Sequence, residues 1–218
     1  MAFRPLSLVH PSITGPGWRS CTALGADNHL EVALQLSQRS VVPIVLAVVV
    51  GALVAAAPAS AEQACPAANA TPASATKHQI LRATLCALNR ERVHYGLGKL
   101  TLNRKLSRAA RRHAHDMARR NYFSHDTLGG GTFVERIRAT GYLKGARSWL
   151  VGENLGWGSH GYSKPSAIMR MWMNSPGHRA NILNGSFREI GIGLAYDAPV
   201  ADGGKPVCTY ATDFGTRQ

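Results

Sequence analysis

The strongest constraint on the fold lies near the end of the chain, where two segments alternate between apolar and polar residues. The segments "EIGIGLAY" (189–196) and "VCTYATDF" (207–214) each follow a period of two, and the polar loop "DAPVADGGKP" joins them. Alternation with this period is typical of β-strands, and two strands joined in this way pair as an antiparallel hairpin. A third segment, "WLVGENLGWG" (149–158), is too short and too rich in glycine for a helix and suits a strand.

Helical patterns precede these strands. From Lys77, apolar residues recur at helical spacing until "GLGKL" ends the run, and residues 104–121 carry a second apolar stripe. Thr132 and Glu135 form a capping box that begins a short helix, and "PSAIMRMWMN" (165–174) predicts a further helix. Because the helices come first and the strands last, we expect an α+β domain in which helices cover a sheet.

An apolar segment in the N-terminal quarter of the chain has the pattern of a targeting signal. An apolar stretch at 41–57 ends in the small residues "ASA", which is typical of a secretory signal peptide cut after Ala61. The alternative is a retained membrane anchor, since the stretch is near the lower limit of the roughly 17–25 residues that span a bilayer. We expect a secreted protein with three parts: a signal peptide at 1–61, a linker at 62–77 and a folded domain at 78–218. The signal peptide is long, so either its N-terminal region is extended or the start site is misassigned.

Three cysteines follow the predicted cleavage site, namely Cys65, Cys86 and Cys208. Thiols outside the cytoplasm tend to pair, and three of them leave one unpaired. Cys65 lies in the linker and Cys86 lies in the first predicted helix. We predict that these two form a disulfide that attaches the linker to the domain.

The chain is strongly basic, with a formal net charge of +13 at pH 7. Export makes nucleic acid an unexpected partner, whereas anionic envelope polymers and phospholipid head groups are expected ones, with only peripheral membrane contact unless the apolar segment is retained. The most basic surface is that of the predicted helix at 104–121, and its candidate anion-binding residues are Arg108, Arg111, Arg112 and Arg119. The alternative is that these charges only keep the surface solvated.

Polar residues that could carry chemistry occur beside strongly structured neighbours. Ser175 and Pro176 are typical of a helix start, because serine can accept from a free backbone N–H and proline suits the first helical position. His178 would lie in the first turn, where the helix dipole favours the neutral imidazole that binds metals or accepts protons. His125 and Glu153 are the other two candidates, although buried histidines are more often hydrogen-bonded parts of a core.

Several motifs, taken together and in order, resemble one known family. They are "NYFSHDT", "VGENLGWG", "MWMNSPGHRANILN", "FREIGIGLAY" and "YATDFG". The chain is similar to the bacterial, SCP-like branch of the CAP superfamily, which includes cysteine-rich secretory proteins, antigen 5 and pathogenesis-related 1 proteins. The resemblance covers roughly residues 78–216 and implies a three-layer α-β-α sandwich around an antiparallel sheet, with one large cleft.

The resemblance also implies a site. His125, Glu153 and His178 match the family residues that line the cleft, and in some members the two histidines bind zinc. Eukaryotic relatives carry a second glutamate on the helix before the last histidine, whereas this chain has no acidic residue between Trp172 and His178. We therefore expect weaker metal binding than in the fuller sites, or none.

Three functions follow from these observations. The first is a secreted binding module with a His/Glu-lined cleft, which can bind a divalent metal such as zinc and associates with lipid or anionic envelope surfaces. The alternative is a metal-dependent hydrolase of envelope peptide or ester bonds, in which zinc on His125 and His178 activates water and Glu153 acts as the base or orients the site. The third is a scaffold whose polar trio is only a hydrogen-bonded cluster.

Overall fold

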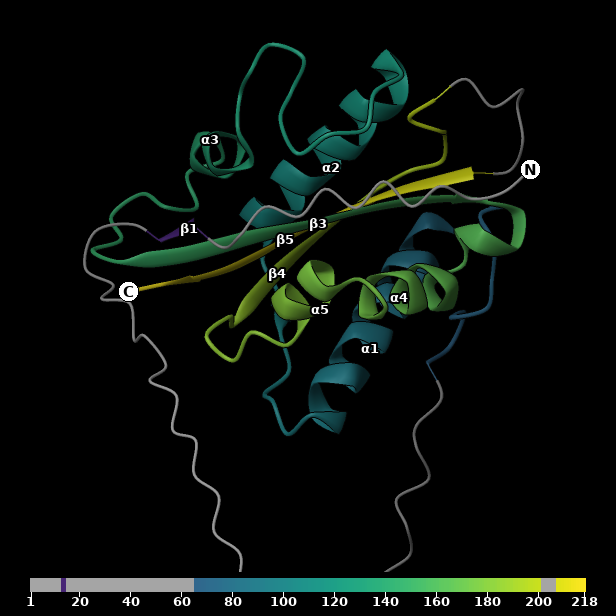
Figure 1. Cartoon of the computed structure of the whole chain (residues 1–218), viewed down its shortest axis with the longest axis horizontal. Helices are drawn as coiled ribbons and strands as arrows, with labels where there is room; N and C mark the ends of the chain where they lie inside the picture. Colours follow the sequence, from purple (N-terminus) through teal and green to yellow (C-terminus); the bar gives the residue numbers. More distant parts are fainter. Residues whose placement is uncertain (1–12, 15–64, 201–206) are drawn as a thin grey trace, which may run out of the picture. The chain divides into compact units, whose positions relative to one another are not determined.

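A computed structural model of the chain describes residues 13–14, 65–200 and 207–218 (Figure 1). Apart from residues 13–14, the predicted signal peptide lies outside the described residues. Within the described part of the chain, no helix is both long enough and apolar enough to cross a membrane.

The helices begin and end close to the predicted positions. They are α1 (Lys77–His94), α2 (Arg104–Arg120), α3 (Phe133–Ala139), α4 (Pro165–Met173) and α5 (Pro176–Ile182), with a 3₁₀ turn, η1, at His160–Ser163. The predicted capping box at Thr132 and Glu135 is present, and Gly141 has a positive φ of 77° just after α3 ends. Such a conformation costs glycine little and ends the helix there.

The strands form one sheet in the order β1-β3-β5-β4-β2. Their bounds are β1 (Ile13–Thr14), β2 (Thr101–Leu102), β3 (Trp149–Ser159), β4 (Glu189–Ala195) and β5 (Val207–Arg217). The predicted hairpin of β4 and β5 is confirmed, and β3 pairs antiparallel with β5 along its whole length. The short β2 pairs parallel with β4, so the sheet is mixed rather than wholly antiparallel as the resemblance implied.

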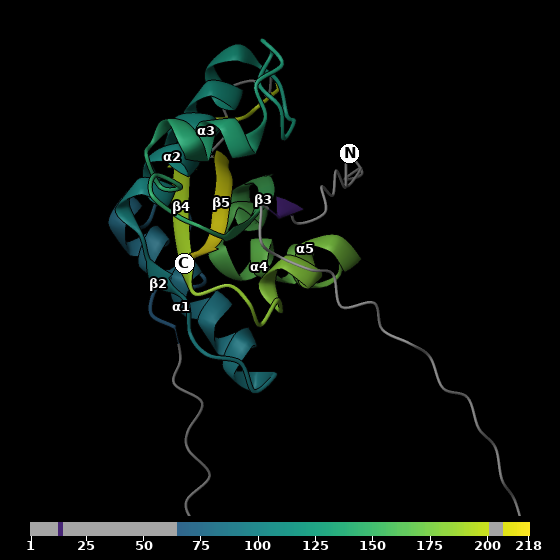
Figure 2. The ribbon, with the colours of Figure 1, turned by 90° about the vertical axis from the view of Figure 1, so that its left-hand side faces the viewer.

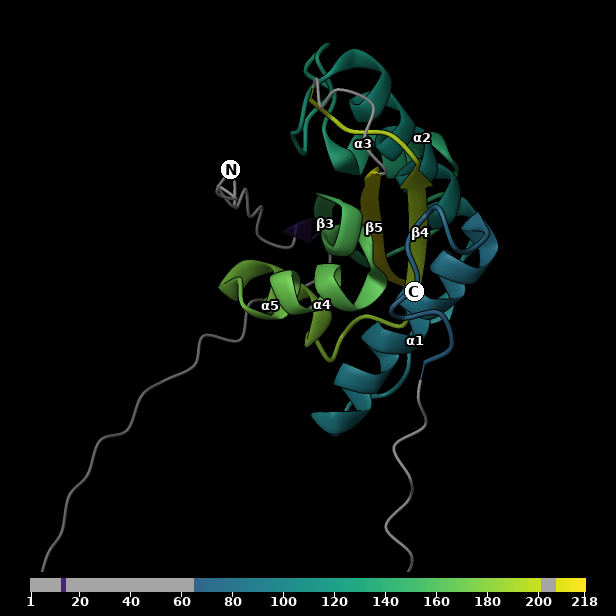
Figure 3. The same ribbon diagram turned by 90° about the vertical axis from the view of Figure 1, so that its right-hand side faces the viewer.

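Helices cover both faces of this sheet, which confirms the predicted α-β-α layers (Figures 2 and 3). Helices α2 and α3 lie on one face, and α1, α4 and α5 lie on the other. With both faces covered, β3 and β5 are buried along nearly their whole length. Their side chains therefore point into one of two apolar layers, and any polar group on them needs a partner there.

Helix α2 rests directly on the backbone of β4 because that strand carries glycine where the helix crosses it. A Cβ atom at Gly191 would lie 2.1 Å from the carbonyl carbon of Leu106, and one at Gly193 would lie 2.2 Å from that of Ala110. The apolar stripe of α2 supplies the rest of this contact, and its residues are buried as predicted: Leu106, Ala109, Ala110, His113, Ala114, Met117 and Ala118. The close approach holds the first half of α2 against the sheet.

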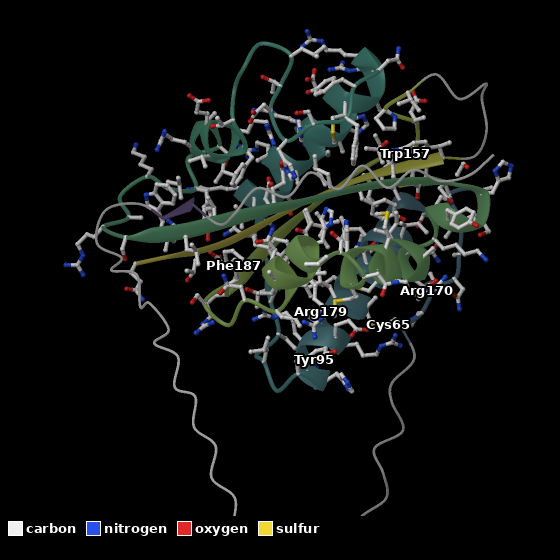
Figure 4. The ribbon with its side chains drawn as sticks, viewed as in Figure 1. Cys65, Tyr95, Trp157, Arg170, Arg179 and Phe187 are labelled. Atoms are coloured by element: carbon white, nitrogen blue, oxygen red, sulfur yellow. A yellow bond between two sulfur atoms is a disulfide. The ribbon has the colours of Figure 1, made fainter. Side chains whose placement is uncertain are left out.

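The opposite layer is held by a disulfide and by a buried arginine. Cys65 and Cys86 are joined as predicted (Figure 4), and the described residues 65–76 form turns that pack against the core, where the Ala68 carbonyl accepts from the Ser166 N–H at 2.9 Å. Arg92, only 1% exposed, donates to backbone carbonyls of the segment after α1, of the last residue of α5 and of the segment after α5. Those acceptors are Gly98 (2.8 Å), Ile182 (2.7 Å) and Asn184 (2.9 Å).

The contact between α2 and β4 gives a stability test. We expect Gly193→Ala to lower the free energy of unfolding by about 3 kcal/mol, because the new methyl group would meet helix backbone that cannot rotate away. Urea unfolding measures this change, and Gly161→Ala is the matched control because its added Cβ has no described atom within 4 Å apart from those of its neighbours along the chain. Equal stability of the two variants would contradict the close packing of α2 on β4.

Candidate functional site

The centre of the site is a buried carboxylate on β3. Glu153 is 2% exposed and points toward the layer of α2 and α3, where both of its oxygens are engaged. His125 Nδ1 lies 2.8 Å from Oε1, and because a carboxylate can only accept, Nδ1 carries the proton. Arg136 of α3 donates from Nη2 to Oε2 at 2.6 Å and from Nη1 to the His125 carbonyl at 2.6 Å. Arg136 therefore holds both the carboxylate and the loop that carries the histidine.

These contacts determine the charge of Glu153. Burial alone would raise the pKa of this carboxyl group, but the positive charge of Arg136 and the hydrogen bond from His125 outweigh it and lower the pKa well below its usual value. Glu153 is therefore ionised at neutral pH and is a weak base.

A second buried carboxyl group, which the sequence analysis did not identify, faces Glu153. Asp213 on β5 lies directly opposite Glu153 in the sheet, and neither of its oxygens accepts a hydrogen bond from a donor group among the described residues. Burial, and then the negative charge of Glu153, raise the pKa of Asp213 well above its usual value. A protonated Asp213 can donate to Glu153, so the pair carries one negative charge rather than two. The sequence does contain a signal for Asp213, because an acidic residue stands there at an inward-facing position of a predicted strand.

His178 lies in α5, in the layer on the other side of the sheet. The helix begins at Pro176 as predicted, but Ser175 does not cap a backbone N–H; its Oγ lies 2.8 Å from His178 Nδ1 instead. The His178 carbonyl accepts from Asn154 Nδ2 at 3.0 Å, and Asn181 Nδ2 donates to the Glu153 carbonyl at 3.1 Å. These amide side chains attach α5 to β3 on the face opposite the Glu153 side chain.

The predicted neutral imidazole at position 178 has a different main cause from the helix dipole. Burial, followed by the charge of His125, lowers the pKa of His178 to about 4. The charge of His125 therefore affects the protonation of His178. His125 and Glu153, by contrast, are in direct contact through a hydrogen bond. All three are largely covered: His125 is 3% exposed, Glu153 2% and His178 7%.

A separate cavity runs beside this cluster, along α2. It has a volume of about 610 Å³ and is lined by five arginines: Arg111, Arg112, Arg119, Arg120 and Arg136. Three of the four predicted anion-binding arginines line it, and the fourth, Arg108, is exposed outside it. Arg136 links this cavity to the cluster, since it lines the one and binds Glu153 in the other. The local sequence around Arg136 held no signal for this role.

The described residues offer an incomplete set of ligands for zinc. His125 and His178 supply two imidazoles, whereas protein zinc sites use three or four ligands. Glu153 would be the third, but both of its oxygens are engaged by His125 and Arg136. Over the described ranges, no group of three or more His, Cys, Asp and Glu side chains is placed to hold a metal. The residues of the cluster therefore do not make up a complete zinc site.

Comparisons with known proteins agree with this architecture. A family model described as CAP, the cysteine-rich secretory protein family, matches residues 85–210, which is more than half of the chain. The Bacillus subtilis protein YkwD is 34% identical over 138 residues, which span 63% of this chain and 49% of YkwD. The membrane protein YlbC of the same organism is 32% identical over 103 residues, which span 47% of this chain and 28% of YlbC. The matches thus span about half or less of these relatives.

Two solved structures have a similar fold. One is an extracellular protein containing an SCP domain from Bacillus anthracis, with a TM-score of 0.50, 26% identity and coverage of 64% of this chain and 43% of that one. The other is an outer surface protein from Borrelia burgdorferi, with a TM-score of 0.53, 21% identity and coverage of 66% of this chain and 96% of that one. Both neighbours are extracellular or surface proteins.

The lowered pKa of His178 predicts a dependence of stability on pH. The unfolded histidine takes up a proton near pH 6.5 and the folded one only near pH 4, so stability is lost as pH falls between these values. The difference corresponds to about 3 kcal/mol. Because Asn cannot be protonated, His178→Asn should flatten this slope in urea unfolding curves measured at several pH values.

The control for this measurement is the exposed His78. His78→Asn should leave the slope between pH 4 and 6.5 unchanged, while the buried His113, whose pKa burial also lowers, contributes to the slope in every variant. An unchanged slope in His178→Asn would contradict the burial of a neutral imidazole at this position.

Proposed function

The chain belongs to the CAP, or cysteine-rich secretory protein, family, and on that premise we propose that it is a secreted, non-enzymatic module that binds anionic components of the cell envelope through the arginine-lined face of α2. The observation that carries this proposal is the cavity of about 610 Å³, which five arginines line. Asp116 is an acidic residue of this lining, and it is already within 3.8 Å of Arg120. The face therefore attracts anions of either polymers or lipid head groups.

Secretion is supported by the apolar segment at 41–57 and by the extracellular or surface location of the structural neighbours. The disulfide between Cys65 and Cys86 also favours an oxidising compartment. In such a compartment, the envelope polymers and the lipid surface are the anions available to this face.

Binding is favoured over turnover because Glu153, the predicted base of the cluster, is already engaged. Glu153 is ionised, but both of its oxygens already accept hydrogen bonds, and the contact with Arg136 weakens it further as a base. The cluster serves instead to fix α3, β3 and the His125 loop around the cavity.

Reversal of the cavity charges tests the binding surface. We expect the double variant Arg111→Glu and Arg119→Glu to weaken binding to anionic vesicles by about tenfold at low salt, since two attractions become repulsions. Binding of the unchanged protein should also fall steeply as salt approaches physiological strength. Vesicle co-sedimentation measures both effects.

The matched control is Arg82→Glu, because Arg82 is an exposed arginine of α1 in the other layer. The proposal fails if this control weakens binding as much as the double variant does. It also fails if binding of the unchanged protein does not depend on salt.

Metal content separates binding from the hydrolase alternative. We expect protein purified without a histidine tag to contain much less than one zinc per chain, because two imidazoles make a weak site. Elemental analysis measures the content, and peptide, ester and glycan substrates test turnover. Stoichiometric zinc that is lost in His178→Asn, together with turnover that is lost in Glu153→Gln, would favour the hydrolase instead.

A further inference from the structure

Two buried polar atoms without hydrogen-bond partners belong to residues that line the arginine cavity. They are Nδ1 of His113 and Nε of Arg136, and neither has a partner among the residues that the structure describes. His113 is 1% exposed and sits in the apolar stripe of α2. A buried polar atom left unpaired costs free energy, so two of them beside one cavity indicate that a ligand completes their bonding.

The two atoms differ in what they offer. His113 Nε2 lies 2.8 Å from the Ser124 carbonyl, which can only accept, so Nε2 carries the proton. Burial lowers the pKa of His113 and keeps the ring neutral, which leaves Nδ1 as an acceptor. Arg136 uses Nη1 and Nη2 for the His125 carbonyl and for Glu153, which leaves the Nε–H as a donor. These two residues of the lining thus hold one unpaired acceptor and one unpaired cationic donor beside the cavity.

The entrance to the cavity selects for negative charge. Arg111, Arg112, Arg119 and Arg120 are exposed there. The lining carboxylate of Asp116 accepts from the Tyr122 hydroxyl at 2.5 Å and lies 3.8 Å from Arg120, so its charge is partly offset. A ligand must therefore be an anion that also has a proton to donate.

We propose that this cavity is a binding site for a phosphomonoester group, with an ionised oxygen accepting from Arg136 Nε and a P–OH donating to His113 Nδ1. A phosphomonoester has its second pKa near 6, so it keeps a proton to share near neutral pH, whereas a sulfate or a phosphodiester has none. The inference rests on the proposed function and deepens it, because it names the chemical class of the anion.

The first experiment compares inorganic phosphate with sulfate by calorimetry on the full chain, at about pH 6.5, near the second pKa of phosphate, and at constant ionic strength. Phosphate should bind about tenfold more tightly than sulfate, which is the effect of one buried hydrogen bond. In His113→Gln, the side-chain amide can still donate to the Ser124 carbonyl, but the Nδ1 acceptor is lost. The ratio of the affinity for phosphate to the affinity for sulfate should therefore fall to about one. In His113→Asn, an oxygen takes the place of Nδ1, so part of the preference should return.

A variant at the entrance provides the control. Arg111→Ala should weaken the binding of phosphate and of sulfate to the same degree, because it removes a positive charge without changing the hydrogen bonds of the lining. Equal binding of phosphate and sulfate by the unchanged protein overturns the inference, and this result does not depend on whether any variant folds. A preference for phosphate that persists in His113→Gln overturns it as well.

The same measurements separate this inference from the proposed function. If salt-sensitive binding to anionic vesicles is present but phosphate is not preferred over sulfate, the proposed function stands and the inference fails. If no anionic probe binds at all, both fail.

A last comparison identifies the source of the phosphate. Vesicles that contain phosphatidic acid, a monoester, are compared with vesicles of equal charge that contain phosphatidylglycerol, a diester, and with soluble glycerol phosphate. The apolar segment at 41–57 contributes equally to both kinds of vesicle, so the monoester vesicles should still bind more tightly. Tighter binding to these vesicles than to glycerol phosphate indicates a lipid, and equal binding indicates a soluble or polymeric phosphate. Tighter binding to the diester vesicles would contradict the inference.

Discussion

The ion pair between Arg136 and Glu153 is the interaction on which the site depends. An ionised carboxylate buried to this degree costs several kcal/mol unless a charged partner compensates for it. Arg136 compensates for it at 2.6 Å and, with the other end of the same guanidinium group, holds the His125 carbonyl. The same side chain also lines the arginine cavity. One arginine of α3 therefore joins the buried cluster on β3 to the surface that we propose to bind ligand.

Helix α2 has two roles, and they lie on different faces of this amphipathic helix. Its apolar stripe lies on β4, where Gly191 and Gly193 let the helix backbone approach, and its polar faces carry the arginines of the cavity. Because the helix backbone lies against β4 at Gly191 and Gly193, the part of α2 that begins the row of arginines is held on the sheet. His113 belongs to both faces at once, being part of the buried stripe and of the cavity lining.

Sequence patterns were informative where the interactions are local. The hairpin of β4 and β5 followed from alternation, the buried face of α2 from its periodicity, and the disulfide from the few available cysteines. Interactions between distant segments left no such pattern: the two-residue β2 is too short to show a period, and two carbonyl partners of Arg92 lie 90 and 92 residues away. Ser175 has the residue type and position of a helix cap, yet it binds the His178 ring, because that buried ring needs a partner more than the helix end does.

The disulfide between Cys65 and Cys86 has a mechanical consequence. It closes a loop that contains residues 66–85, including the turns that pack on the core and the first half of α1. Tension applied to the chain ahead of Cys65 would pass through the two sulfur atoms into the second half of α1 and would bypass this loop. A protein attached to a moving surface by its N-terminal end would thus bear load on α1, which Arg92 ties to the segment after α5, rather than peel open from its first turns.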